Sequence, residues 1–297
     1  MERTDPPITS VRNSSVVEAR KLTQKKHRAR QGRFLVEGLQ LLATAVERMA
    51  DSPWGAKIVP RELFYCEEPL VGETAPRLLR ALADAGARTI CVASHVLDTL
   101  SERETSQGLV GTFDLRSLEV SLDEIPPTDP ASPGLVLVLD RLQDPGNLGT
   151  LIRTADAVGA TAVVLLEPSV DPFDPKAVRG TMGSLFSVRL VRVRETDALW
   201  SRLAEIGYGP VGADAHTDAS VWERRALAGS VALVLGNEAR GLSADVRDAV
   251  FEYVSLPLVG GAESLNVAVA GGVLMYEWLR VNRPRGRGID RPASRGG

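Results

Sequence analysis

The sequence predicts an α/β protein with two domains, and three observations support this prediction. Apolar runs that favour strands alternate with segments of helical periodicity along most of the 297 residues. A proline-rich segment divides this alternation into a shorter and a longer part. In the longer part the apolar runs are continuous, which is typical of strands buried on both faces of a parallel sheet. We therefore expect an N-terminal domain over 1–116, a linker over 117–134, a larger domain over 135–283 and a disordered basic tail over 284–297.

The composition is that of an ordinary soluble globular protein, with 44% apolar residues and a net charge of −3. No apolar run reaches the roughly 18 residues of a membrane span, and the first residues lack the apolar core of a signal peptide. We therefore expect a cytoplasmic protein with no membrane contact. The two cysteines, Cys66 and Cys91, lie in apolar contexts and predict free thiols. The three histidines, His27, His95 and His216, are widely separated, so no metal site is expected.

Short strands and helices fill the predicted N-terminal domain. A polar, basic helix over 14–30 precedes an apolar run between Gly32 and Gly38, and an amphipathic helix over 39–49 follows. The remaining elements are a strand at 62–66, a helix at 75–85, a strand at 89–93, a helix at 94–101, and a turn and strand within 105–113. Their alternation indicates a small α/β fold.

Buried strands organise the predicted larger domain, and they are expected at 135–139, 162–166, 188–193, 208–213 and 231–235. Residues 253–256 lead to a stretch that is expected to begin as a short strand at Leu256. The helix after the first strand starts at the cap residue Asn147 and ends at Gly159. Its apolar face is formed by Leu148, Leu151, Ile152 and Ala155. Further helices are expected at 176–180, 197–206 and 244–249, and a last one after the corner Ser264-x-Asn266. A parallel sheet of this kind places chemistry at the carboxyl ends of its strands.

Positive charge is concentrated near both ends of the chain. Against the single acid Glu18, residues 12–33 contain eight basic residues: Arg12, Arg20, Lys21, Lys25, Lys26, Arg28, Arg30 and Arg33. Near the C-terminus Asp290 stands against Arg280, Arg283, Arg285, Arg287, Arg291 and Arg295. Basic clusters on an acidic body favour a polyanionic partner, so the first cluster predicts nucleic-acid binding. For the tail, nucleic-acid binding and a solvated disordered segment remain equal alternatives.

Three loops after buried strands carry the candidate chemistry. They are Asp144-Pro-Gly-Asn-Leu-Gly-Thr-Leu-Ile-Arg153, Gly236-Asn-Glu-Ala-Arg-Gly241 and Glu263-Ser-Leu-Asn-Val267. None of them is a dinucleotide-binding glycine fingerprint, a phosphate-binding loop or a nucleophile elbow. NAD and ATP therefore lack their usual sequence support. Taken singly, each loop is also consistent with a glycine turn followed by a helix cap.

Together and in this order, the loops resemble the SPOUT class of RNA methyltransferases, specifically the SpoU or TrmH family of ribose 2′-O-methyltransferases. The resemblance covers about residues 135–280. Its motifs correspond to Asn147 through Arg153, to Gly236-Asn-Glu238 with Gly241, and to Pro257 through Val267. The segments Phe34-Leu-Val-Glu-Gly38 and Gln107-Gly-Leu-Val-Gly111 are similar to the substrate-binding domain of this family.

The resemblance implies a catalytic domain with a deep trefoil knot, a homodimer, S-adenosylmethionine as methyl donor and no metal. It places the methyl donor near Gly236, Leu256, Leu258, Leu265, Ala213 and Asn266, with Asp214 close by. It places catalysis at Arg153, Asn147, Glu238, Ser264 and Asn266. The basic residues then expected to bind RNA are Lys25, Lys26, Arg28, Arg30 and Arg33. The glycine-bearing helix over 268–279 would suit close packing in the dimer.

Methyl transfer to a ribose oxygen requires two aligned reactants and a group that stabilises the developing alkoxide. A guanidinium is effectively never deprotonated, so we expect Arg153 to grip the 3′ phosphate or the oxyanion rather than act as base. Glu238 and Asn147 are expected to hold the arginine and the loops. Ser264 and Asn266 are expected to order the last loop and to contact the ribose. Simpler structural interpretations remain open: Glu238 as a helix N-terminal residue and Asn147 as a cap alone.

Several substrates and functions remain alternatives. The separate N-terminal domain favours large-subunit (23S) ribosomal RNA over transfer RNA, since family members that act on large-subunit RNA often carry such a domain. Some of these are resistance enzymes of antibiotic-producing actinomycetes, such as those for thiostrepton and avilamycin. The alanine-, valine- and arginine-rich composition is compatible with an actinomycete origin. A non-catalytic RNA-binding protein would be expected to have lost the motifs, and none is lost here. A nicotinamide-linked enzyme lacks its glycine fingerprint.

Overall fold

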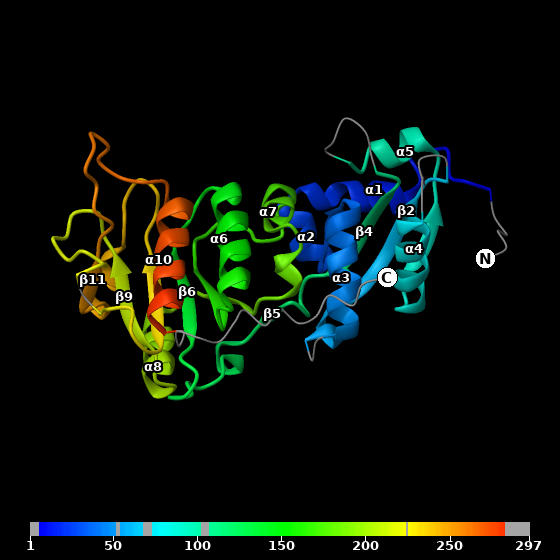
Figure 1. The fold of residues 1–297 in the computed structure, drawn as a ribbon. Coiled ribbons are helices and arrows are strands. Elements are labelled where there is room, and N and C mark those ends of the chain that lie inside the picture. Colours follow the sequence, from blue (N-terminus) through cyan, green and yellow to red (C-terminus); the bar gives the residue numbers. More distant parts are fainter. Residues whose placement is uncertain (1–5, 52–53, 68–72, 102–106, 224, 283–297) are drawn as a thin grey trace.

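The computed structural model describes residues 6–51, 54–67, 73–101, 107–223 and 225–282, which form two α/β domains side by side (Figure 1). The predicted tail over 284–297 lies outside these residues. Within them, Cys66 is buried and Cys91 half-buried, and no disulfide joins the two. No helix in the described part of the chain is long and apolar enough to cross a membrane.

The N-terminal domain is a four-stranded sheet with helices on both faces. Its strand order is β1 (Arg33–Glu37), β4 (Leu109–Asp114), β2 (Pro60–Tyr65) and β3 (Arg88–Cys91), with only the β2–β3 pairing parallel. Alternate side chains face opposite sides, so one face packs against α3 (Leu39–Asp51) and α4 (Thr74–Asp84). The other face packs against α1 (Ser14–Arg20) and α5 (Ser94–Asp98). A 3₁₀ turn, η2 (Gly55–Lys57), follows α3.

The segment 14–30 is not one continuous helix, so the prediction of a single basic helix is wrong. It consists of α1, a 3₁₀ turn η1 (Lys21–Thr23) and α2 (Lys25–Gln31). The Arg28 guanidinium donates to the carbonyls of Leu22 and Thr23 at 2.8 and 2.9 Å. These carbonyls are therefore bonded to a side chain, where a continuous helix would bond them to backbone amides.

The larger domain is built on a parallel sheet, as predicted, and this sheet has seven strands. Its order is β11 (Glu252–Val254), β9 (Gly209–Ala213), β10 (Val231–Leu235), β6 (Leu135–Asp140), β7 (Ala162–Leu166), β8 (Leu190–Val193) and β5 (Glu119–Val120). The chain runs from β6 through β7 to β8 and then continues on the opposite side of β6. Such a reversal is the switch point where ligands bind in open parallel sheets.

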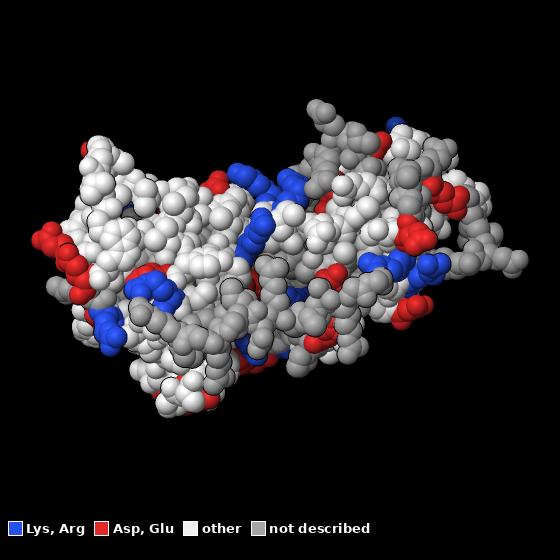
Figure 2. Space-filling view, in the orientation of Figure 1, with Lys and Arg blue, Asp and Glu red and all other residues white. Residues whose placement is uncertain are grey.

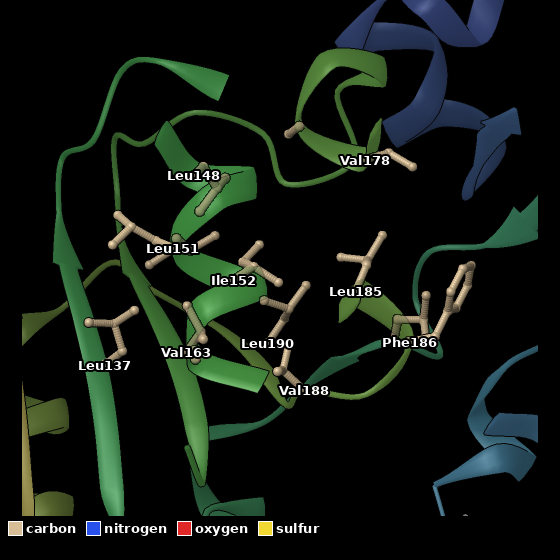
Figure 3. Packing of buried hydrophobic residues seen from close by; sticks show 14 of the residues in the cluster. Leu137, Leu148, Leu151, Ile152, Val163, Val178, Leu185, Phe186, Val188 and Leu190 are labelled. Atoms are coloured by element: carbon tan, nitrogen blue, oxygen red, sulfur yellow. The ribbon is translucent and has the colours of Figure 1, made fainter. Parts of the chain in front are cut away.

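Helices cover both faces of this sheet, and their boundaries lie close to the predicted ones. On one face lie α6 (Pro145–Val158), α7 (Pro175–Thr181) and α10 (Val267–Asn282). On the other lie α8 (Thr196–Glu205) and α9 (Ala244–Ala249). The predicted apolar face of α6 packs on β6, β7 and β8, with Leu148, Leu151 and Ile152 pointing into the layer (Figure 3). This burial orients the opposite face of α6 outward.

The segment predicted as a linker is part of the larger domain. Glu119 and Val120 pair in parallel with Leu190 and Val191 of β8, and Val120 is buried. The 3₁₀ turn η3 (Leu122–Glu124) follows. This edge strand could not be read from a proline-rich segment, because only two residues pair and their partner lies some 70 positions later.

A shared aromatic cluster joins the two domains. The ring of Phe34 in β1 lies 4.7 Å from that of Phe173, and Phe113 in β4 lies 5.2 Å from Phe186 in η4 (Ser184–Phe186). Phe186 lies at the side of the larger domain that faces the N-terminal domain (Figure 3). The two domains therefore share one continuous apolar core, which fixes their relative orientation.

Candidate active site

A cavity of about 550 Å³ lies at the carboxyl ends of β9 and β10, next to the switch point of the sheet. Its lining includes all six residues predicted to hold a methyl donor: Ala213, Gly236, Leu256, Leu258, Leu265 and Asn266. Asp214, Glu238 and Ser264 line it as well. Pockets of roughly 300–1,000 Å³ with apolar walls and a few polar groups are typical small-molecule sites.

Gly236 is required by the close approach of its own loop. The amides of Asn237 and Gly241 bond to each other's carbonyls at 2.9 Å and close a tight turn after β10. A Cβ at position 236 would lie 2.3 Å from the Gly241 carbonyl carbon and 2.6 Å from the Leu242 nitrogen. Only glycine fits there, and the tight turn leaves backbone groups at the cavity wall.

Glu238 connects this turn to the start of α6. Its carboxylate accepts from the amides of Gln143 and Asp144 at 3.2 and 3.1 Å, and from the Asn147 side chain at 3.1 Å. Partial burial raises the pKa of the Glu238 carboxyl, but these bonds and one from its own backbone amide outweigh burial and lower it. Glu238 is therefore ionised at neutral pH. It lies in a turn, so the alternative of a helix N-terminal residue is wrong.

Asn147 and Asn266 extend this connection to the last loop. The Asn266 amide donates to the Asn147 side-chain oxygen at 3.0 Å, and its own oxygen caps α10 by accepting from Ala268 and Val269. The predicted cap role of Asn147 is wrong, because Asp144 caps α6 by accepting from the Asn147 amide at 2.8 Å. Glu238, Asn147 and Asn266 thus join the three predicted loops side chain to side chain.

Arg153 and Ser264 are exposed and available to a substrate. Arg153 lies on the outward face of α6, and it forms no hydrogen bond or ion pair with another described residue. The expectation that Glu238 and Asn147 hold the arginine is not met, since they hold the loops instead. Ser264 lines the cavity with its hydroxyl unbonded to any described residue.

The sequence-based reasoning missed the contacts that fix α6. Lys176 of α7 pairs with Asp144 at 3.2 Å. Backbone packs on backbone between α6 and α7, because a Cβ on Gly149 would lie 2.8 Å from the Gly180 Cα. The dipeptide Asp144-Pro145 is itself a helix-start signal and could have identified the cap. The role of Gly149 becomes visible only when α7 is in place.

The basic residues predicted to bind RNA fall into three groups by their exposure. Lys25, Lys26 and Arg30 are exposed on α2. Arg33 is half-buried and paired with Glu62. Figure 2 shows Lys and Arg side chains gathered over the region where α6, α7 and α2 meet in Figure 1. The prediction for Arg28 is wrong: its side chain is 2% exposed and its guanidinium is bonded to Asp171, so it cannot reach a phosphate.

Two predicted segments of the N-terminal domain also meet in space. Phe34–Gly38 and Gln107–Gly111 contribute β1 and β4, which pair in antiparallel fashion. The Gln107 side chain accepts from the Leu39 amide at 3.0 Å and so satisfies a donor at the start of α3. No group of three or more His, Cys, Asp or Glu that could hold a metal occurs among the described residues.

By its fold and cavity, this is a two-domain α/β protein with a small-molecule site at the carboxyl ends of the strands of a parallel sheet. Residues 134–276 match the SpoU rRNA Methylase family, and residues 13–111 match the MRM3-like substrate binding domain. The chain belongs to the SpoU rRNA methylase family. The resemblance predicted from the three loops is confirmed.

Relatives of similar length share both domains. A 23S rRNA guanosine 2′-O-methyltransferase of Bacillus subtilis is 32% identical, over 91% of this chain and 97% of that one. A 23S rRNA uridine 2′-O-methyltransferase of Streptomyces viridochromogenes is 33% identical, over 87% and 86%. Among solved structures, an AdoMet-bound rRNA methyltransferase from Sinorhizobium meliloti matches with a TM-score of 0.80, 31% identity and coverage of 93% and 97%.

Proposed function

We propose that this protein transfers a methyl group from S-adenosylmethionine to a ribose 2′-hydroxyl of 23S ribosomal RNA. The observation that carries the proposal is the side-chain connection Glu238–Asn147–Asn266, which joins three loops around one cavity. Relatives that span nearly the whole chain act on 23S rRNA ribose, which supports the same substrate over transfer RNA.

The cavity suits the methyl donor in its chemistry. Apolar side chains of Leu256, Leu258 and Leu265 line it and would pack on the adenosine ring. Asp214 and the ionised Glu238 line the cavity and would favour the positively charged sulfonium, whereas Arg240 and Arg247, which also line it, would favour the carboxylate of the methionine part. The turn at Gly236 brings backbone groups close enough to recognise polar edges. S-adenosylmethionine, when bound there, supplies the methyl group.

The residues around the cavity would then align and stabilise the transfer. Arg153, which has no partner among the described residues, would bind the 3′ phosphate or the alkoxide that develops at the 2′ oxygen. The Ser264 hydroxyl would contact the ribose. Glu238 and Asn147 would keep the loops at near-attack geometry, since loss of about 1 Å of alignment can cost 10²-fold in rate. Lys25, Lys26 and Arg30 would hold the RNA backbone near the domain boundary.

We further infer that the loop over 255–266 completes a deep trefoil knot and that the protein works as a homodimer. On α10, Val269, Val273 and Tyr276 are 54, 40 and 53% exposed at i, i+4 and i+7, which forms an apolar stripe for a second copy. Gly271 serves packing within the chain, because a Cβ there would lie 2.5 Å from Leu235 and 2.6 Å from Leu151. Light scattering of Val273→Glu should report monomers if this stripe forms the dimer.

An enzyme that acts on ribosomal RNA works where ribosomes assemble, so we infer a cytoplasmic location. A role in antibiotic resistance stays a prediction. The test of the proposed function is methyl transfer to total rRNA, followed by primer extension at low dNTP concentration, where a methylated ribose causes a stop. We expect one stop, in 23S rRNA. Stops on neither large- nor small-subunit RNA would contradict the proposal and favour transfer RNA.

A further inference from the structure

The boundary between the domains holds a buried arginine with a complete set of protein partners. The Nε and Nη2 groups of Arg28 donate to one carboxylate oxygen of Asp171 at 2.9 and 2.7 Å. Its Nη1 group donates to the two carbonyls of η1, and Nη2 also lies 3.6 Å from Asp174. Arg28 belongs to the N-terminal domain, whereas both acids belong to the catalytic domain. It therefore joins the domains and is unavailable to RNA.

The catalytic-domain segment that receives Arg28 is held from two sides. Asp171 also accepts from Arg192 of β8 at 2.9 Å and from the Phe173 amide at 3.1 Å. The Phe173 ring packs on Phe34 of the N-terminal domain. The position of residues 171–174 thus depends on both domains. A segment held by buried charge and an aromatic contact has little freedom to shift by itself.

This segment leads directly into α7, which contacts the start of α6. Asp174 caps α7 by accepting from the Lys176 amide at 3.0 Å. The Lys176 ammonium pairs with Asp144 at 3.2 Å, and Asp144 caps α6 through the Asn147 amide. Because Gly149 and Gly180 bring the backbones of α6 and α7 into contact, the two helices must move together. An unbroken series of contacts therefore runs from Arg28 to Asn147.

We propose that Arg28 is a positioning residue for methyl transfer. Through Asp171 and Asp174, and then through α7 and the Lys176–Asp144 pair, it sets the start of the helix that presents Asn147 and Arg153. The substrate-binding domain then does more than hold RNA, because it also fixes the geometry of the catalytic loops. The inference rests on the proposed function for its kinetic consequence, but the contacts themselves are independent of the substrate.

The kinetic test is Arg28→Met in the full chain. Asp171 keeps its bond to Arg192, so the substitution leaves no buried acid without a partner. We expect kcat at saturating RNA and S-adenosylmethionine to fall about tenfold or more, because small misalignments of reacting groups are costly. The Kd of S-adenosylmethionine and the Kd of RNA should each stay within about threefold of wild type, a change of under 1 kcal/mol. An unchanged kcat with a raised KM for RNA would instead show that the substitution disturbs RNA binding alone, and it would overturn the positioning role.

A matched control and a second substitution separate positioning from a loss of folding. Arg202 of α8, on the face of the sheet opposite α6 and α7, likewise donates to two backbone carbonyls, of Asp123 and Ile125, and pairs with the acid Glu205. Arg202→Met should keep kcat. Lys176→Met removes an exposed link and should lower kcat without unfolding. The double variant that carries both Lys176→Met and Arg28→Met should lose no more kcat than the more impaired single variant. If the two losses in kcat instead multiply in the double variant, Arg28 and Lys176 act independently, and the proposed series of contacts is overturned.

Hydrogen–deuterium exchange supplies a readout that needs no RNA. Amides over 146–150, at the start of α6, should exchange faster in Arg28→Met than in wild type, and Arg202→Met should leave them unchanged. If the wild-type protein fails to methylate rRNA, the proposed function fails while this measurement still tests the structural route. Unchanged exchange at the start of α6, or faster exchange with an unchanged kcat, would overturn the role assigned to Arg28.

Discussion

Arg153 and Arg28 are residues of the same type in two different regions of the molecule, the catalytic domain and the domain boundary. Arg153 stands on the outward face of α6 with no described partner. Arg28 is 2% exposed at the domain boundary and is bonded to an acid and two carbonyls. Both were predicted to act on RNA, yet only Arg153 is accessible to it. An arginine contributes to substrate binding only when its donors are free, and burial with acids makes it a structural link.

The largest effect should follow from removing the accessible arginine. Arg153→Ala should lower the rate of methyl transfer by about 10³-fold, as loss of a donor to a developing oxyanion does. The Kd of S-adenosylmethionine, measured by calorimetry, should stay within about twofold, since Arg153 does not line the cavity. Arg194→Ala, another exposed arginine of the catalytic domain, is the control. Wild-type turnover in Arg153→Ala would remove the contrast between the two arginines.

The cavity itself can be tested through its tight turn. Gly236→Ala would place a methyl group 2.3 Å from the Gly241 carbonyl carbon, so the turn must open. We expect the affinity for S-adenosylmethionine to fall by about tenfold to a hundredfold, which corresponds to 1.4–2.8 kcal/mol. Gly209→Ala at the start of β9 meets no atom within 4 Å and should bind normally. Equal affinities of the two variants would contradict a binding role for this turn.

The exposed part of the basic cluster should affect RNA binding and not chemistry. Replacing Lys25, Lys26 and Arg30 by glutamine should weaken RNA binding and lower the slope of log K against log salt by about 2, given 0.7–0.9 per phosphate contact. The rate at saturating RNA should be nearly unchanged, in contrast with Arg28→Met. Filter binding across a salt series measures this. Parallel salt curves for variant and wild type would exclude these side chains from the RNA interface.

The smallest effect concerns pH. The folded-state pKa of Glu238 lies below its ordinary 4.5, so the stability it contributes is fully present above about pH 4.5 and is lost as the pH falls through the folded pKa. The difference in thermal midpoint between wild type and Glu238→Gln should therefore be constant from about pH 5 to 8 and shrink below that range. A difference that instead shrinks as the pH rises from 6 to 8 would indicate a raised pKa and a role for Glu238 as base.

The sequence predicts most of the larger domain because its signals are local. Continuous apolar runs predict β6, β7 and β10 nearly to the residue, and the spacing of Leu148, Leu151 and Ile152 predicts the buried face of α6. The cap at Asn266 is also confirmed. These features depend on side-chain periodicity and on backbone groups a few positions away.

Other features depend on partners distant in sequence and could not be predicted. The break between α1 and α2 depends on where Arg28 finds acceptors, and Asp171 lies 143 positions away. The glycines of α10 suggested contact with a second copy, whereas Gly271 packs against Leu235 and Leu151 of its own chain. The start of α6 shows the same limit: Asp144 is a local signal, but its pairing with Lys176 requires α7.

The central claim is that the cavity and Arg153 together direct a methyl group to a ribose of 23S rRNA. The most direct measurement uses S-adenosylmethionine with a trideuterated methyl group and unmodified 23S rRNA, followed by digestion to nucleosides and mass spectrometry. We predict one 2′-O-trideuteromethyl nucleoside with the wild-type protein and none with Arg153→Ala. A label on a nucleobase, or equal labelling by both proteins, would contradict the account.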